Sequence, residues 1–124
     1  MNMHAQAAKT YGYLGSAKVD ERSAEYQVIA GITSRLQKAH NSGPIAFVSL
    51  AASLTENRRL WTEFAIDIAN VDNSMPPMLK KQIMELAIFT LRHTEHVISG
   101  AADADVLIEI NLAIMRGLSG KRAV

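Results

Sequence analysis

Cysteine does not occur in this chain of 124 residues. Its absence excludes disulfide bonds and thiolate metal sites, and it is compatible with the reducing interior of a cell. No uninterrupted apolar run approaches the ~20 residues that a membrane-spanning helix requires. The N-terminal residues MNMHAQAAKT also lack the apolar core of a secretory signal. We therefore expect a cytoplasmic protein without membrane insertion.

A marked excess of one charge is also lacking. Lysine and arginine number 13 against 12 acidic residues, so the formal net charge is only +1 and no global field attracts nucleic acid. Three basic pairs, Arg58–Arg59, Lys80–Lys81 and Lys121–Arg122, could together contact RNA phosphates. Acidic neighbours and scarce aromatic residues instead favour ordinary solvated positions, so RNA ranks as a minor alternative partner. Near-neutral charge gives little protection against self-association, which leaves a homodimer open.

Signs of catalysis are absent too. The seven glycines are scattered and form no phosphate-binding loop. No serine or threonine can be paired with a base, and no two carboxylates can be assigned to a shared cleft. We expect no enzymatic activity, no catalytic residue and no cofactor.

Two histidines, His93 and His96, stand three residues apart in a segment with helical periodicity. This spacing places both imidazoles near one helix face and could bind a metal. A structural zinc site usually has four ligands, however, and His4 and His40 stand alone in segments that we predict to lie at the surface. We expect solvated surface histidines and no metal site.

The clearest feature is the stretch NRRLWTEFAIDIAN at residues 57–70, which contains the only tryptophan. Its apolar residues recur at spacings of three, four and seven, which predicts an amphipathic helix. Truncating a buried tryptophan costs roughly 3–5 kcal/mol. We predict Trp61 as the centre of the core, so that a Trp61→Ala variant loses stability before it loses affinity. The predicted buried face consists of Asn57, Leu60, Trp61, Phe64, Ala65 and Ile68.

Similar periodicity and helix-end signals run through the rest of the chain. They predict an all-α fold, a small antiparallel helical bundle of about four main helices with a short N-terminal arm or helix. The expected parts of this single domain, 1–124, are an arm (1–18), a bundle (19–118) and a basic tail (119–124). The expected helices are Val19–His40, Pro44–Asn70, one from Pro76 or Pro77 to about Ile98, and one from Asp103 or Asp105 to about Gly117. The second of these is either continuous or interrupted by a kink or short break at Ser53–Asn57.

The sequence also predicts how two helix ends are capped and what one polar residue in an apolar face does. Ser74 is a plausible N-cap of the third helix, and Gly100 stands where a left-handed C-terminal cap is usual. The third helix should bury Leu79, Ile83, Leu86, Ala87, Leu91 and Ile98. Asn111 falls on an apolar face, where its amide needs hydrogen-bond partners. It either ties the last helix to the turn around Asn73 or anchors a partner peptide, and we favour the structural role.

Three segments stand out in order along the chain: Arg59, Leu60, Trp61, Thr62, Phe64 and Asp67, then Asn73, Pro76, Leu79 and Lys80, then 107–111 with Ile110 and Asn111, Ile114, Gly117 and Leu118. Together they resemble the FlaF family of flagellar biosynthesis regulators of alphaproteobacteria. The resemblance covers 57–118, about half of the chain, and the first helix fits it more loosely. The sequence departs from the family pattern where it has Met75 in place of a leucine and Lys80 in place of an arginine, and MELAIFTLRH follows Ile83 where a second tryptophan is common.

The resemblance implies a non-enzymatic role in flagellum assembly: binding flagellin, supporting its synthesis and export, and acting with the post-transcriptional regulator FlbT. The alternative is a regulator that binds flagellin mRNA directly or through FlbT. An adaptor for a different helix is indistinguishable from a flagellin chaperone by sequence.

A small bundle can hold an amphipathic helix of flagellin in an apolar groove. We place this groove between the first helix and the pair formed by the second and third, with the arm around Tyr11 and Leu14 as its cover. The motivating observation is apolar excess on the second and third helices, although an ordinary core or a dimer contact would explain it equally. The residues predicted to contact the partner are Tyr11, Leu14, Ile66, Met84, Ile88 and Phe89.

Overall fold

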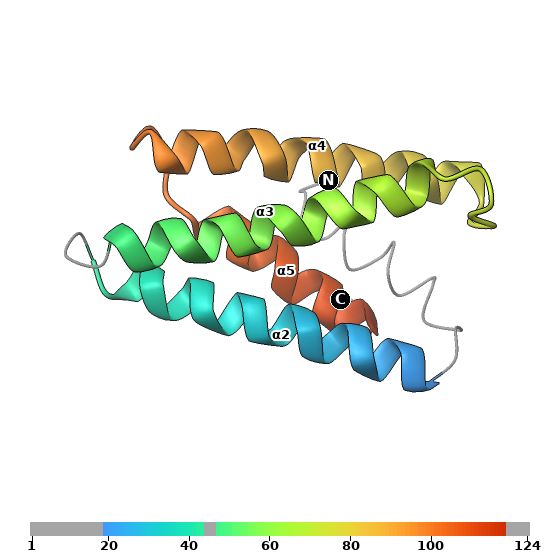
Figure 1. Ribbon diagram of the computed structural model, residues 1–124, viewed down its shortest axis with the longest axis horizontal. Helices are drawn as coiled ribbons and strands as arrows, with labels where there is room; N and C mark the ends of the chain where they lie inside the picture. Colours follow the sequence, from blue (N-terminus) through green and yellow to red (C-terminus); the bar gives the residue numbers. More distant parts are fainter. Residues whose placement is uncertain (1–18, 44–46, 119–124) are drawn as a thin grey trace.

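Four α-helices make up the described part of the chain, residues 19–43 and 47–118 of the computed structural model (Figure 1). Within those ranges there is no β-strand, so the predicted all-α class is confirmed. The predicted arm with Tyr11 and Leu14, and the predicted tail, lie outside the described residues. The helices are α2 (Val19–Asn41), α3 (Phe47–Ala69), α4 (Pro77–Ile98) and α5 (Asp105–Leu118).

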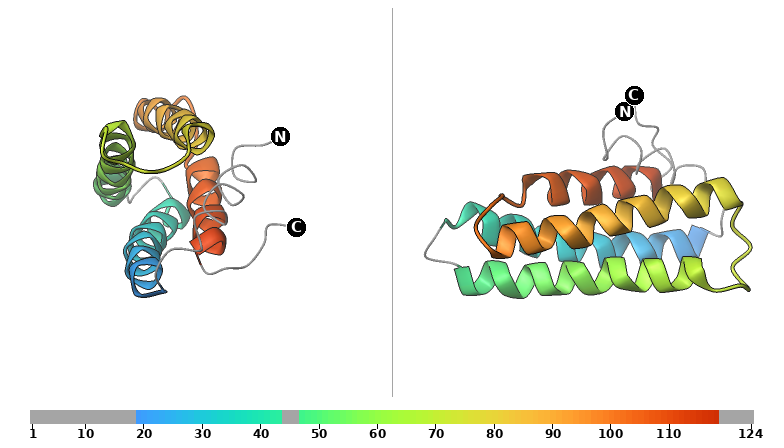
Figure 2. Two further views of the ribbon diagram at one scale, coloured as in Figure 1. Left: turned by 90° about the vertical axis from the view of Figure 1, so that its right-hand side faces the viewer. Right: turned by 90° about the horizontal axis from the view of Figure 1, so that it is seen from above.

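The helices form a bundle in which each packs beside its neighbours. Viewed end on, they follow each other around the bundle in the order α4, α3, α2, α5 (Figure 2). Helix α3 packs against both α2 and α4, while α5 packs mainly against α2 and touches α4. Consecutive long helices run antiparallel, as short connections require (Figure 1). The predicted small antiparallel bundle is therefore confirmed.

Helix α3 is continuous through the predicted weak point at 53–57. The side chain of Thr55 does not cap a new turn there, because its Oγ1 donates a hydrogen bond to the carbonyl oxygen of Ala51 at 3.0 Å. Ser53 and Asn57 are buried instead of facing a break. The interior polar residues of α3 thus serve packing between helices, and the helix keeps its regular geometry.

The start of α4 differs from the prediction. Pro76 occupies the N-cap position without a side-chain cap hydrogen bond, and Pro77 is the first helical residue, so the expected Ser74 cap is wrong. The fixed φ of proline suits the first turn of a helix, and its missing N–H removes a donor that would otherwise lack a helical partner. Two consecutive prolines therefore begin the helix without help from Ser74.

The end of α4 is closed by Gly100, as predicted. Its φ is +83°, a conformation that L side chains rarely adopt. The N–H of Ala101 donates to the carbonyl of His96 at 2.8 Å, and the N–H of Gly100 donates to the carbonyl of Val97 at 3.1 Å. This pair of bonds is the Schellman arrangement that closes helix C-termini. Helix α5 then starts after Asp103, whose carboxylate accepts the N–H of Asp105 at 3.0 Å.

The core consists of two clusters of buried apolar side chains. The larger surrounds Trp61, whose exposed fraction is 0%, and the smaller surrounds Leu36 and Leu54. The edge of the Trp61 indole meets the ring of Phe64 with centroids 5.2 Å apart. Trp61 is thus confirmed as a central core residue. The larger cluster is formed by Ile29, Ile32, Leu60, Trp61, Ile68, Ile83, Leu86, Ala87, Ile110, Ala113 and Ile114.

The second half of α4 turns a different face inward than predicted. Thr90, Thr94 and Val97 are buried there, whereas Leu91 is half-buried and Ile98 is exposed. The threonine at 94 hides its polarity because its hydroxyl donates to the carbonyl of Thr90 at 2.7 Å. A hydroxyl satisfied by its own helix is compatible with burial. The prediction from apolar residue types alone therefore placed the buried face of this half of α4 one residue away from its actual position.

Candidate functional site

A buried chain of hydrogen bonds links α3 to α5 through the core. The indole Nε1–H of Trp61 donates to Oδ1 of Asn111 at 3.0 Å, and Nδ2 of Asn111 donates to Oδ1 of Asn57 at 2.7 Å. Both asparagines are buried. Asn111 therefore ties α5 to α3, and the predicted tie to the turn around Asn73 is wrong. The favoured structural role of Asn111 agrees with these contacts.

Two buried polar atoms near the same helices have no hydrogen-bond partner among the described residues. They are Nδ2 of Asn57 and Oγ1 of Thr90. Leaving a buried donor unsatisfied costs ~1–3 kcal/mol, so the polar core is not optimised for stability alone. The hydrogen-bonded chain of Trp61, Asn111 and Asn57, by contrast, penalises any shift of α5 along α3, because a shift would break its two hydrogen bonds.

The turn between α3 and α4 is built by Asp67 and Asn73, two residues of the family resemblance. Nδ2 of Asn73 donates to Oδ2 of Asp67 at 3.3 Å, and its Oδ1 accepts the N–H of Met75 at 2.9 Å. Asparagine commonly stabilises turns through such local bonds. These residues fix the turn that leads into Pro76, which is itself exposed.

The other residues of the resemblance serve mainly as core. Arg59 is exposed, Phe64 is half-buried, and the side chain of Leu118 lies outside the described part. The resemblance therefore rests on residues that hold the fold together, and the surface that contacts a partner has to be sought elsewhere. The buried members are Leu60, Trp61, Leu79, Ile110 and Asn111.

An apolar groove, here the α2–α3 groove, lies between α2 and α3 with a volume of about 270 Å³. Its floor is formed by Ile29 and Leu60, with Phe64 half-buried beside them. Val28 lines the groove and is 56% exposed, although it is a large apolar residue. The remaining lining residues are Ala24, Glu25 and Glu63. A floor of apolar side chains with two carboxylates in the lining fits an amphipathic helix better than a polar metabolite.

The residues predicted to contact a partner are not brought together in this groove. Ile66 is 66% exposed on α3 but does not line it. Met84 and Phe89 are half-buried and pack on the larger core cluster from α4. The partner-binding groove was predicted between α2 and the pair formed by α3 and α4, whereas the groove observed in the described part of the chain is lined by α2 and α3 alone. Helix α4 packs on the side of α3 away from α2, and so its apolar excess faces elsewhere (Figure 2).

Ile88 and Phe89 line a separate depression on α4 of about 390 Å³, together with Glu85, Arg92, His93 and His96. The ring of Phe89 stacks on that of His93 with centroids 5.6 Å apart. His93 is half-buried, and its Nε2 lies 2.9 Å from the carbonyl oxygen of Asp103. His93 therefore keeps part of its side chain at the surface and also connects α4 to the loop before α5, a contact that the sequence did not indicate.

His40 also has a structural contact that the sequence did not indicate. Its Nε2 lies 2.7 Å from Oδ1 of Asp105, which joins the end of α2 to the start of α5. Within residues 19–43 and 47–118, no three potential metal-ligating residues come together. His93 and His40 thus both contact residues at the start of α5.

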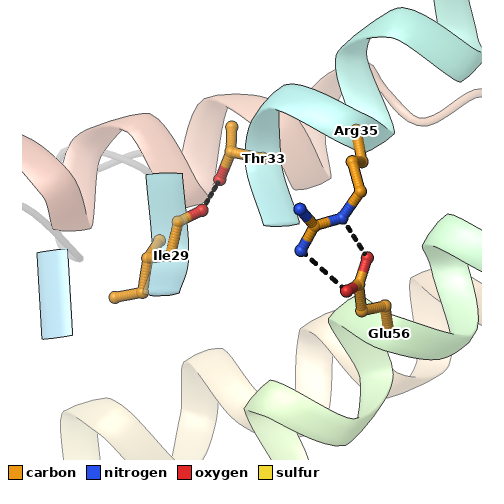
Figure 3. A network of polar contacts seen from close by, with 4 residues as sticks. All are labelled: Ile29, Thr33, Arg35 and Glu56. Carbon is orange, nitrogen blue, oxygen red and sulfur yellow. Dashed lines mark hydrogen bonds and ion pairs between the residues drawn. The ribbon is translucent and has the colours of Figure 1, made fainter. Parts of the chain in front are cut away.

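A bidentate ion pair, Arg35 with Glu56, crosses from α2 to α3 (Figure 3). The Nε and Nη2 atoms of Arg35 donate to the two carboxylate oxygens of Glu56 at 2.8 and 2.7 Å. These hydrogen bonds lower the pKa of Glu56 below its ordinary value, and the charge of Arg59 acts in the same direction. Sequence periodicity could not reveal this pair, because both residues lie on solvated faces.

Leu60 and Phe64, which line the α2–α3 groove, were singled out from the sequence, but Val28, Glu25 and Glu63 were not. One signal was present: Val28 is a large apolar residue that stands directly beside Ile29. A single extra valine is common on helix surfaces, so it became informative only when Phe64 appeared across the groove.

A comparison with protein-family models matches residues 7–118 to the family described as flagellar protein FlaF. Parallel comparisons with curated proteins and with solved structures gave no match. None of the helices within residues 19–43 and 47–118 combines the length and the apolarity that a membrane span requires.

Proposed function

The chain belongs to the FlaF family of flagellar proteins, and from this membership we propose that it is a cytoplasmic, non-enzymatic chaperone that binds a helical segment of flagellin and supports flagellin synthesis and export. The observation that carries the proposal is the α2–α3 groove. Val28 and the half-buried Phe64 present an apolar surface between the antiparallel helices α2 and α3, with the buried Ile29 beneath them. A helix with apolar residues at spacings of three, four and seven fits such a surface.

The hydrogen bonds within the core support the α2–α3 groove as a binding surface. Trp61 and the two buried asparagines fix α3 against α5 from below. The groove wall on α3 is therefore held rigidly while its outer face stays accessible. A preformed site loses less conformational entropy when it binds a partner than a site that must first fold.

The experiment is co-elution of the purified protein with monomeric flagellin on a sizing column. A Val28→Glu variant places a charge in the α2–α3 groove without disturbing a buried residue, and it should abolish co-elution. Val48→Glu is the matched control, because Val48 is 82% exposed on α3 and does not line the groove. This control should co-elute like the wild type.

Two results would contradict the proposal. Co-elution that survives Val28→Glu but is lost in Ile88→Glu would move the site to the α4 depression. No co-elution of the wild type, combined with a specific complex on flagellin leader RNA that weakens steeply with salt, would favour the mRNA-binding alternative. The same column run with FlbT would show whether flagellin or FlbT binds in the groove.

A further inference from the structure

Helix α4 presents a stripe of exposed side chains on the side opposite its buried face. The members of the stripe recur at spacings of four and three, so they lie along one line on the helix surface. Within residues 19–43 and 47–118, none of its four charged members forms an ion pair. The stripe, which we call the outer α4 face, consists of Lys81, Glu85, Ile88, Arg92 and Glu95.

The charges of the outer α4 face are complementary to those of the same face on a second copy. Along the chain the members are positive, negative, apolar, positive and negative. A second copy that runs antiparallel, about a two-fold axis beside Ile88, presents this order in reverse. Lys81 then faces Glu95 of the second copy, and Glu85 faces Arg92 of the second copy. A parallel copy would instead place like charges opposite each other, which disfavours that arrangement.

Charged neighbours on the same helix do not remove this complementarity. Lys81 precedes Glu85 by one turn, and Arg92 precedes Glu95 by three residues. Exposed side chains at these spacings attract each other only weakly. The four charges therefore stay available to a second copy, in which each meets the opposite sign.

The shape of α4 also suits a facing helix. Glu85, Ile88, Phe89 and Arg92 line the α4 depression of about 390 Å³, and they stand at positions i, i+3, i+4 and i+7. Four residues at this spacing form the hole that receives one side chain of a facing helix. Ile88 is 44% exposed, and in the antiparallel arrangement it lies beside the two-fold axis. The Ile88 side chain of each copy can therefore enter the hole of the other, against the half-buried Phe89.

We propose that the outer α4 face binds a second copy of this chain in an antiparallel, two-fold symmetric dimer. The net charge of +1 per copy opposes association only weakly. One helix from each copy offers less contact area than the ~1,200–2,000 Å² of a standard interface, so the dimer is a weak one. Helix α4 packs on the side of α3 away from α2, and so both α2–α3 grooves stay uncovered in the dimer (Figure 2). The inference does not require that either groove binds flagellin.

Exchanging charges on the outer α4 face tests the dimer and its direction. The measurement is sedimentation equilibrium of the purified full chain over a series of concentrations, and the wild type should show a monomer–dimer equilibrium. Glu85→Arg should raise the dissociation constant about tenfold, because it replaces two attractions between the copies with two repulsions. The double variant Glu85→Arg/Arg92→Glu should return to the wild-type constant. An equimolar mixture of Glu85→Arg and Arg92→Glu should dimerise more strongly than either variant alone, since opposite charges meet in the mixed dimer.

A matched control separates these contacts from the total charge. Asp72→Arg makes the same change of charge at an exposed position in the turn between α3 and α4, and it should leave the dissociation constant unchanged. Circular dichroism should show wild-type helix content in every variant, because all the substituted side chains are exposed.

Three results would overturn the inference. They are a wild type that stays monomeric throughout the series, a Glu85→Arg variant that dimerises like the wild type, and a double variant as weak as Glu85→Arg. A monomeric wild type whose co-elution with flagellin is lost in Ile88→Glu would assign the α4 depression to flagellin instead. The sedimentation measurements use this chain alone, so a failure there leaves flagellin binding in the α2–α3 groove untouched.

Discussion

Replacing Asn111 with leucine tests whether the buried amide chain holds α5 against α3. Leucine has the same heavy-atom branching as asparagine, so the change removes polarity while keeping the shape similar. The change leaves two buried atoms without partners. In the wild type, Nε1 of Trp61 lies 3.0 Å from its acceptor on Asn111, and Oδ1 of Asn57 lies 2.7 Å from its donor on Asn111. No other hydrogen bond of these two atoms is recorded in the described part of the chain.

The expected magnitude follows from these two atoms. Each unsatisfied buried group costs ~1–3 kcal/mol, a total of about 2–6 kcal/mol. The greater apolarity of leucine offsets about 1–2 kcal/mol of this loss. The midpoints, about 4 kcal/mol lost and about 1.5 kcal/mol regained, give an expected fall in the free energy of unfolding of about 2.5 kcal/mol, a large share of the roughly 5–15 kcal/mol of a small domain.

Urea unfolding at pH 7 measures this change, with the single tryptophan as the fluorescent reporter. The matched control is the double variant Asn57→Leu/Asn111→Leu. It also removes Oδ1 of Asn57 and the unpartnered Nδ2 of that residue, so only the indole N–H stays unsatisfied. The double variant should be more stable than Asn111→Leu alone. An Asn111→Leu protein as stable as the wild type, or a double variant less stable than the single one, would refute the reasoning.

Four further substitutions have expected outcomes. Trp61→Ala should cost roughly 3–5 kcal/mol in urea unfolding followed by circular dichroism; a stable, folded variant that no longer binds flagellin would contradict the core assignment. Gly100→Ala should lower the free energy of unfolding by about 1–2 kcal/mol because its φ is +83°. Gly31→Ala should change it less, because the gain in helix propensity, about 0.5–1 kcal/mol, is opposed by the new Cβ 3.3 Å from Nη1 of Arg35, whose guanidinium is held by Glu56. Thermal melts in which Gly31→Ala is the more destabilised variant would contradict both expectations. Hydrogen bonds from Arg35 lower the pKa of Glu56 in the folded state, so the ionised Glu56 stabilises the fold fully above the ordinary pKa of 4.5 and loses this effect as the pH falls through the lowered pKa. The difference in stability between the wild type and Glu56→Gln should therefore shrink below pH 4.5. A difference that grows there would contradict the direction of the pKa shift.

Where the partner surface lies was the hardest feature to predict. Ile66 and Ile88 stood out in the sequence as surplus apolar residues, yet neither lines the α2–α3 groove. Surplus apolar residues show that the apolar face of a helix is wider than a single contact with one neighbour needs. They do not show which neighbouring helix or partner covers the extra width. Val28 contributes to a surface only because Phe64, on another helix, lies opposite. Pairings of this kind depend on the order of helices around the bundle, which local periodicity does not contain.

The sequence by itself determined where the long helices lie, the burial of Trp61 and the left-handed cap at Gly100. These features depend on periodicity and backbone preference within a few residues of each position. Only the tertiary structure decided that Asn111 bonds to Asn57 rather than near Asn73, and that Arg35 meets Glu56, partners 54 and 21 residues apart along the chain. It also decided that Thr90 and Thr94 face inward, because the buried stripe of α4 is set by the helices packed against it. Hydrogen bonds and grooves between helices arise from how whole helices are rotated and paired, and a signal confined to one turn of helix cannot specify that rotation.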